Sequence, residues 1–168
     1  MKSIVIYYSF SGNTRKVAQT LCGYLSQKGG VTEIELKAAD EAGSFFGQCR
    51  RAFTRSRAEL ESVNFDLGAY DLICFGTPVW AFGPAPAMNT YLDKCLGAAG
   101  KEIVLFTTYG SGTGNNRCLN YMQDILAQKG AKSFQRFSIQ QFKVKNKELV
   151  LSEIKAAMRL SPPGTQRI

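Results

Sequence analysis

The chain has 168 residues, of which 45% are apolar and 20% charged, and its formal net charge is +8. This composition is typical of a soluble globular protein, and the length fits one domain that buries a sizeable core. Histidine is absent, which excludes Ser–His–Asp and Cys–His catalysis and most zinc sites. We therefore expect no metal ion. Because no apolar run approaches the roughly 18 residues of a membrane span, we also expect no membrane insertion.

Five cysteines are scattered along the sequence without a C-x-x-C pair. An odd number of dispersed cysteines is typical of free thiols in a reducing compartment. The first apolar segment begins at residue 4, which leaves no room for a signal peptide before it. We therefore expect a cytoplasmic protein. The positive charge suggests an anionic partner or ligand, but no nucleic-acid-binding motif is found, so we expect no nucleic acid.

The most informative stretch is residues 7–14, with the sequence YYSFSGNT. A β-branched apolar run at 4–8 predicts a buried strand, and apolar residues at helical spacing from Val17 to Leu25 predict a helix. Hydroxyl, amide and glycine residues make up most of the loop between them. A helix start offers unpaired N–H groups and the positive end of the helix dipole, so this loop predicts a phosphate cradle. The alternative is an N-cap with a turn, which the same residue types favour.

The next two segments are a strand and an arginine-rich helix. Residues 31–36 (VTEIEL) alternate between apolar and polar, as in a half-buried edge strand. Residues 44–57 predict an amphipathic helix, with four arginines between Arg50 and Arg57. One interpretation is a solvated basic face. The other is a helix that faces a partner or a substrate.

Residues 70–76 (YDLICFG) form a nearly continuous apolar run, which predicts a buried parallel strand. The following segment, 77–86, contains three prolines, and we expect them to exclude a strand there and to start a helix at Pro84 or Pro86 that ends near Leu96. Trp80, the only tryptophan, falls in this segment. It can fill a hole in the core or stack on a flat ring, and its place in a loop favours stacking.

The C-terminal third repeats the strand–helix pattern. Residues 101–108 predict a central strand, and a glycine-rich loop, YGSGTGNN, leads into a helix that ends near Lys129. Residues 132–139 predict a short edge strand, and residues 147–160 a final helix. We expect residues 1–160 to form a single domain and residues 161–168 a loose tail.

Strands and helices alternate throughout, which predicts an α/β fold with a parallel sheet covered by helices on both faces. Three of the loops, at 9–14, 77–86 and 107–114, leave the carboxyl ends of predicted strands. In an open α/β sheet, ligands bind at that edge. The sequence therefore predicts one ligand site built from these three loops.

The motifs SFSGNT (9–14), TPVWAFGPAP (77–86) and TTYGSGTG (107–114) resemble, in order and spacing, the phosphate loop and the two flavin loops of the flavodoxin-like family. The resemblance is to the short-chain type, and it implies a doubly wound sheet of five parallel strands in the order 2-1-3-4-5, with FMN as the cofactor. It implies that the flavin carries the chemistry, with no catalytic side chain. The residues expected to bind FMN are Ser9, Phe10, Ser11, Gly12, Asn13, Thr14, Thr77, Pro78, Val79, Trp80, Ala81, Thr108, Tyr109, Gly110 and Gly112.

Two functions follow from this resemblance. The first is an FMN-binding redox protein of flavodoxin type that transfers electrons to or from a redox partner protein. The second is an FMN-dependent NAD(P)H:acceptor oxidoreductase that reduces quinones or similar small acceptors. A flavin-free binding module is a third possibility that the intact phosphate loop disfavours. Since the chain is basic and its flavin loops lack Asp and Glu, we expect an acidic partner protein or an anionic molecule such as NAD(P)H.

Overall fold

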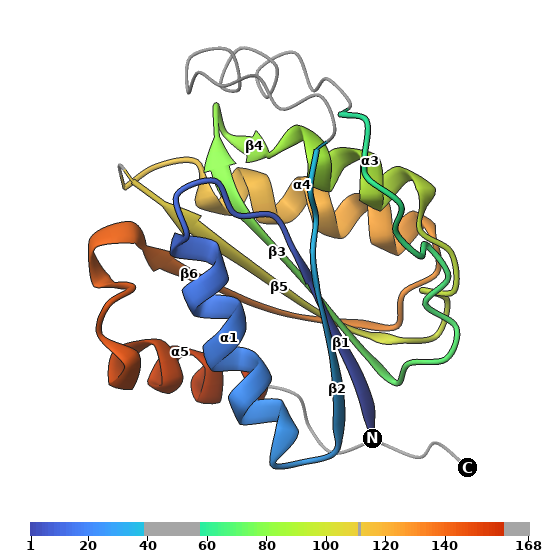
Figure 1. Ribbon diagram of the computed structural model, residues 1–168, viewed down its shortest axis with the longest axis horizontal. Coiled ribbons are helices and arrows are strands. Elements are labelled where there is room, and N and C mark those ends of the chain that lie inside the picture. Colours follow the sequence, from blue (N-terminus) through green and yellow to red (C-terminus); the bar gives the residue numbers. More distant parts are fainter. Residues whose placement is uncertain (39–57, 111, 160–168) are drawn as a thin grey trace.

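The computed structural model describes residues 1–38, 58–110 and 112–159 (Figure 1). Its five long strands are β1 (Lys2–Tyr7), β2 (Gly30–Glu35), β3 (Leu72–Trp80), β5 (Glu102–Tyr109) and β6 (Ser133–Gln140). The helices are α1 (Asn13–Ser26), α3 (Pro86–Lys94), α4 (Asn115–Gln128) and α5 (Lys147–Arg159). A two-residue strand, β4 (Gly83–Pro84), and a 3₁₀ turn, η1 (Gln141–Lys143), complete the described elements.

The long strands pair in parallel in the order β2-β1-β3-β5-β6. Counted along the chain without the short β4, this is the expected order 2-1-3-4-5, and the predicted fold is confirmed. The edge positions predicted for residues 31–36 and 132–139 are confirmed as well, and so is a helix start at Pro86. The predicted helix at 44–57 and the predicted tail at 161–168 lie outside the described residues.

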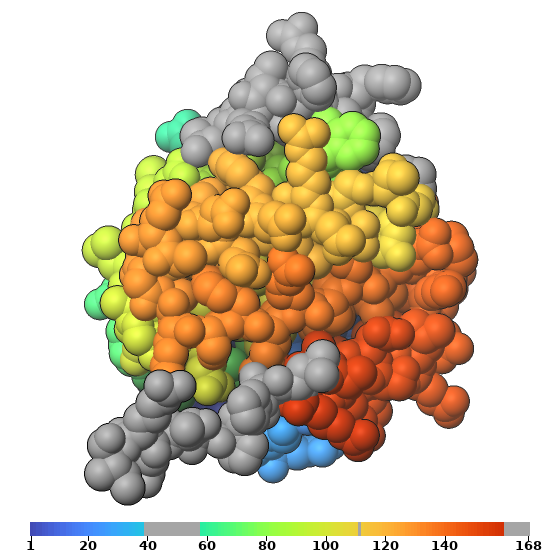
Figure 2. Space-filling view, turned by 180° about the vertical axis from the view of Figure 1, so that it is seen from behind, coloured from blue at the N-terminus to red at the C-terminus, as the bar shows by residue number. Residues whose placement is uncertain are grey.

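Helices cover both faces of the sheet and bury two apolar clusters (Figure 1). Alternate residues of β1 face opposite clusters: Ile4 and Ile6 pack with α3 and α4, whereas Val5 and Tyr7 pack with α1 and α5. This is why β1 reads as a continuous apolar run. In the view from behind, α4 and the segment that leads to α5 form most of the visible surface (Figure 2). No helix in the described part of the chain is long and apolar enough to cross a bilayer.

The expectation that prolines exclude a strand after residue 76 is wrong. β3 continues to Trp80, and Pro78 pairs with Thr108 of β5. On its other side, β3 pairs with β1 only as far as Gly76. Beyond that residue β1 no longer pairs with β3, and a strand tolerates a proline, which has no N–H to donate, where it lacks a partner on one side. The antiparallel turn back through β4 then ends the strand at Trp80.

Gly76 marks the closest packing between β3 and β5. A Cβ built on Gly76 would overlap the ring of Phe106, and this ring is itself stacked on Phe137 with a centroid distance of 5.5 Å and an interplanar angle of 8°. Phe106 is fully buried. The absence of a side chain at residue 76 therefore allows this aromatic pair to lie against the centre of the sheet.

We expect Gly76→Ala to lower the free energy of unfolding by about 1–3 kcal/mol, because the ring of Phe106 has no room to move away from the new methyl group. Gly30→Ala is the matched control, since a Cβ at Gly30 meets nothing within 4 Å, and we expect a change within about 0.5 kcal/mol. Urea unfolding measures both. Equal losses in the two variants would contradict the packing role of Gly76.

Candidate functional site

A cavity of about 580 Å³ opens at the carboxyl ends of β1, β3 and β5. Parallel pairing brings these three strand ends to one edge, and each contributes its following loop. The lining is made of Phe10, Ser11, Asn13, Thr14, Pro78, Val79, Trp80, Ala81, Thr108, Tyr109, Gly110 and Gln141. None of these side chains carries a formal charge at neutral pH. The part of the lining that the structure describes is therefore uncharged.

Most of the predicted site residues line this cavity. The structure brings eleven of the fifteen together there and leaves out Ser9, Gly12, Thr77 and Gly112. It also adds Gln141, which the sequence reasoning missed. Gln141 directly follows the carboxyl end of β6, the strand beside β5. That position is a usable signal, because the end of a neighbouring parallel strand must lie at the same edge of the sheet.

The loop at residues 9–14 closes onto the first turn of α1. Gly12 has a left-handed conformation with φ 80°, which favours glycine, and it is the residue before the helix. The Arg15 backbone N–H donates to Ser9 Oγ at 3.1 Å, and Asn13 Nδ2 donates to Ser11 Oγ at 3.2 Å. Among the described residues, the backbone N–H groups of Asn13 and Thr14 find no acceptor. The helix start therefore has free N–H donors of the kind that bind an anion.

Two threonines of the site make internal hydrogen bonds. Thr14 Oγ1 lies 2.8 Å from Thr108 Oγ1, and both residues are buried. Either hydroxyl can donate, so this pair joins the first and third loops and keeps one proton for another acceptor. Thr77 is fully buried, accepts the Ala85 N–H at 3.0 Å, and donates to the Pro78 carbonyl. Its side chain holds the β3–β4 turn against α3 instead of lining the cavity.

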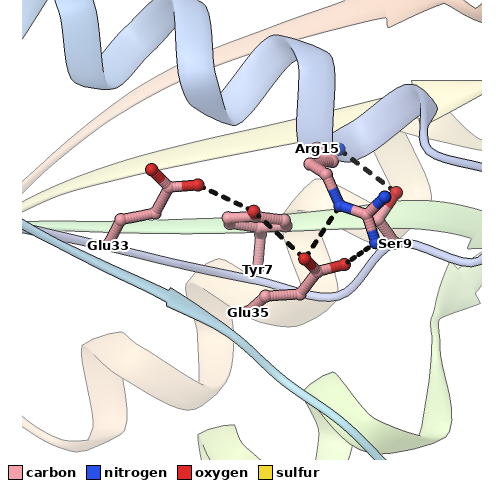
Figure 3. A network of polar contacts seen from close by, with 5 residues as sticks. All are labelled: Tyr7, Ser9, Arg15, Glu33 and Glu35. Carbon is pink, nitrogen blue, oxygen red and sulfur yellow. Dashed lines mark hydrogen bonds and ion pairs between the residues drawn. The ribbon is translucent and has the colours of Figure 1, made fainter.

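An ion pair anchors the start of α1 to the edge strand (Figure 3). The Arg15 guanidinium donates to both carboxylate oxygens of Glu35, at 2.6 and 2.8 Å. The Tyr7 hydroxyl donates to Glu33 at 2.8 Å and lies 3.4 Å from Glu35. Burial and these carboxylates raise the pKa of Tyr7 far above its usual value, so its hydroxyl stays protonated. Arg15 therefore faces β2 through its side chain, while its backbone N–H holds Ser9.

Trp80 is more buried than a loop position predicts. It is the last residue of β3 and only 6% exposed. Its ring meets Tyr8 and Phe10 edge-to-face, with centroid distances of 5.6 and 5.7 Å. The core interpretation is thus correct, yet Trp80 also lines the cavity. Its neighbours fix the ring in one orientation, and this is what a rigid stacking surface requires.

The cysteines that the structure describes lie away from the cavity. The four in the described part of the chain, Cys22, Cys74, Cys95 and Cys118, are free thiols, and none lines the cavity. Burial raises the pKa of Cys22 to about 12 and the pKa of Cys95 to about 11. At neutral pH these thiols are protonated and unreactive. They pack the core, as their dispersed positions predict.

The sequence of residues 2–147 matches the flavodoxin family. The chain belongs to this family. Because the match covers most of the sequence, it includes all three loops of the cavity and the predicted FMN-binding residues within them.

Solved structures with this flavodoxin fold are similar over nearly their whole length. A flavoprotein from Lactobacillus acidophilus NCFM in complex with FMN is 22% identical, with a TM-score of 0.66 over 88% of this chain and 98% of that one. A putative flavoprotein from Bacteroides uniformis is 22% identical, with a TM-score of 0.70 over 92% and 97%. Oxidised flavodoxin 1 from Bacillus cereus is 17% identical, with a TM-score of 0.64 over 96% and 100%. At these identities the likeness concerns the fold.

One turn of this flavodoxin-family chain is strained. Trp80 pairs with Gly83, so Ala81 and Phe82 form a two-residue turn, and both have positive φ angles, 46° and 67°. Such turns favour Asn-Gly, because a left-handed conformation costs an L residue roughly 1–2 kcal/mol. The Phe82 ring leaves no room for a Cβ at Gly114 and thereby holds the turn against the third loop. Ala81 is part of the cavity lining, so the strain lies at the site.

We expect Ala81→Gly to stabilise the protein by roughly 0.5–1 kcal/mol. Glycine adopts the left-handed conformation without strain, but the greater conformational entropy of its unfolded chain offsets part of this gain. Ala156→Gly, at an exposed position of α5, is the control and should destabilise by about 1 kcal/mol. Thermal unfolding gives both values. If Ala81→Gly destabilises as much as the control, the turn stores no strain.

Proposed function

We propose that the chain binds FMN non-covalently in the cavity between the three loops and works as an electron carrier for a partner protein. The observation that carries this proposal is the start of α1, where free N–H groups and hydroxyls meet a neutral cavity large enough for a flat cofactor. Family membership and the FMN complex of the similar L. acidophilus protein support it.

The phosphate would lie against the loop at residues 9–14. Free backbone donors of Asn13 and Thr14, the Ser11 hydroxyl and the Asn13 amide supply neutral hydrogen-bond donors. The first turn of α1 contains no acidic residue, so no carboxylate of this turn repels a phosphate dianion. Arg15 is held by Glu35. Binding therefore uses the helix dipole and hydrogen bonds instead of a cationic side chain.

The isoalloxazine would lie between Trp80 and Tyr109. A cavity of about 580 Å³ is within the range of cofactor pockets. The ring of Trp80 is fixed by two edge-to-face neighbours, so stacking on it costs little ordering entropy. Backbone groups of residues 77–81 and 109–112 can hydrogen-bond the polar edge of the ring. The flavin, when bound, supplies the redox chemistry.

The lining favours a carrier over an enzyme of the NAD(P)H:acceptor class. The described residues that line the cavity include no carboxylate, amine, guanidinium, imidazole or thiol. The described lining therefore offers no carboxylate or imidazole that could act as a general acid or base beside the ring. Its own residues orient the cofactor and exclude water from one face. Electron transfer to a redox partner needs nothing more, and the basic surface fits a partner with an acidic face.

We expect Ser11→Asp to weaken FMN binding about 10-fold or more, because a carboxylate in the phosphate cradle repels the dianion. Riboflavin lacks the phosphate, so its affinity should fall much less. Ser11 is exposed, so the substitution leaves the packing of the core unchanged. Fluorescence titration of the apoprotein measures both ligands. Ser152→Asp on α5 is the control, and equal loss of riboflavin and FMN binding would refute the cradle.

We expect the FMN-loaded protein to catalyse no steady oxidation of NADH or NADPH in the presence of a quinone. The FMN-loaded protein should nevertheless accept electrons from dithionite and return them to an oxidised partner. Absorbance at 340 nm follows the nicotinamide, and the visible flavin bands follow the cofactor. Sustained nicotinamide consumption that scales with quinone concentration would favour the oxidoreductase instead.

A further inference from the structure

A second hollow lies between α1 and α5, on the face of the sheet away from α3 and α4. It has a volume of about 640 Å³ and is distinct from the loop cavity, with which it shares no lining residue. The two helices are neighbours that lie side by side (Figure 1). We call this hollow the α1–α5 groove. Its lining runs along α1 from Lys16 to Gln27 and along the chain from Val144 to Leu151.

Gly23 lies in the middle of the groove wall, inside α1. A glycine within a helix is destabilising relative to alanine. Close packing usually explains such a glycine, yet a Cβ at Gly23 would meet nothing within 4 Å. The described structure therefore gives no internal reason for it. The absence of a side chain at Gly23 leaves space in the groove, which Tyr24 also lines.

The groove has an apolar floor and a cationic rim. Val144 and Leu151 contribute apolar surface. Lys16, Lys145 and Lys147 line the rim and are exposed, and Glu148 is the one acidic residue in the lining. A further lysine, Lys28, lies nearby, with its ammonium 2.8 Å from the Tyr24 hydroxyl. α1 itself contains no Asp or Glu. The charges therefore select an anionic occupant with apolar side chains.

The groove begins close to the proposed flavin cavity. Gln141 lines the cavity, and the η1 turn then leads directly to Val144 and Lys145 in the groove. Lys16 is in the first turn of α1, one residue after Arg15. A partner segment in the groove would therefore bring the partner's surface close to the cavity opening without occupying it.

We infer that the α1–α5 groove docks an acidic amphipathic helix of the partner protein, with its apolar side on the groove floor and its carboxylates on the lysine rim. A groove between α1 and the start of α5, with apolar surface from Val144 and Leu151 in its lining, suits an amphipathic helix seated in a groove. Charge complementarity supplies the specificity and the salt dependence. The partner's role in electron transfer rests on the proposed function, but the docking itself does not.

A fluorescein-labelled peptide of about 14 residues tests the docking, since that length makes about four helical turns. Its leucines lie at i, i+3, i+4 and i+7, and glutamates fill the other exposed positions. One control peptide replaces glutamate with lysine, and another scrambles the leucine spacing. Fluorescence anisotropy gives Kd for the protein with and without added FMN. Because FMN occupancy is read separately from its absorbance, a failed docking and a failed flavin site are distinguishable.

Two double charge reversals locate the site. Lys145→Glu with Lys147→Glu should raise the peptide Kd about 10-fold or more. The matched control, Lys94→Glu with Lys132→Glu, changes net charge equally but lies on α3 and before β6, and its Kd should change less than about twofold. Equal weakening in both variants would show non-specific attraction and overturn the proposal.

Gly23→Leu separates docking from folding. Leucine forms helix better than glycine, and a Cβ at this exposed position meets nothing within 4 Å, so the melting temperature should stay equal or rise. The leucine side chain fills the groove, so peptide binding should be lost. Unchanged peptide binding in this variant overturns the proposal. So does equal affinity of the unaltered protein for the original and the scrambled peptide, or the absence of peptide binding at millimolar protein concentration. Tighter binding of a single-stranded DNA oligonucleotide, lost in the Lys145/Lys147 variant, would assign the groove to nucleic acid instead.

Discussion

The parallel pairing of β1, β3 and β5 is the constraint on which the site depends. Because the three strands run in one direction, the loops after residues 7, 80 and 109 must leave the sheet at one edge. The Thr14–Thr108 hydroxyl contact then joins the first and third loops across 94 residues of sequence. A buried hydroxyl pair is costly to separate, since each group would be left without a partner. The position of the α1 start relative to the third loop is therefore fixed by a buried contact.

The start of α1 is held from two further directions. Ser9 accepts the Arg15 N–H from the loop, and Glu35 binds the Arg15 side chain from the edge strand. The same arginine thus connects strand β2 to the loop that precedes the helix. With the Arg15 N–H bound to Ser9, the backbone N–H groups of Asn13 and Thr14 remain without an acceptor among the described residues. Backbone donors that are already held in place lose little conformational entropy when they bind an anion, whereas a flexible cationic side chain loses more.

Local patterns predicted the α/β fold, the helices of the described regions and a site at three loops, whereas the strand order and the individual site residues came from the resemblance to the flavodoxin-like family. Apolar alternation, the stripe from Val17 to Leu25 and Pro86 at a helix start act through neighbouring residues, so the sequence displays them directly. Pro78 and Trp80 were misjudged because their state depends on distant strands. β1 ends at residue 7 and leaves the edge that tolerates Pro78, and Tyr8 and Phe10 bury Trp80. Gln141 was missed for the same reason, since only the β5–β6 pairing brings it to the cavity.

The described charged side chains lie outside the cavity lining, and several of them line the α1–α5 groove. The chain has eight more basic than acidic residues, yet none of the cavity residues is charged. Among the described residues, no cationic side chain lines the proposed cofactor site, so the anion donors found there are hydrogen bonds and the helix dipole. Cations do gather along the neighbouring groove, at Lys16, Lys145 and Lys147. Charge exposed to water contributes little to folding stability, whereas it steers the approach of an oppositely charged surface. The lysines of the groove thus fit the acidic partner that we propose, whereas the described cofactor site needs no cationic side chain.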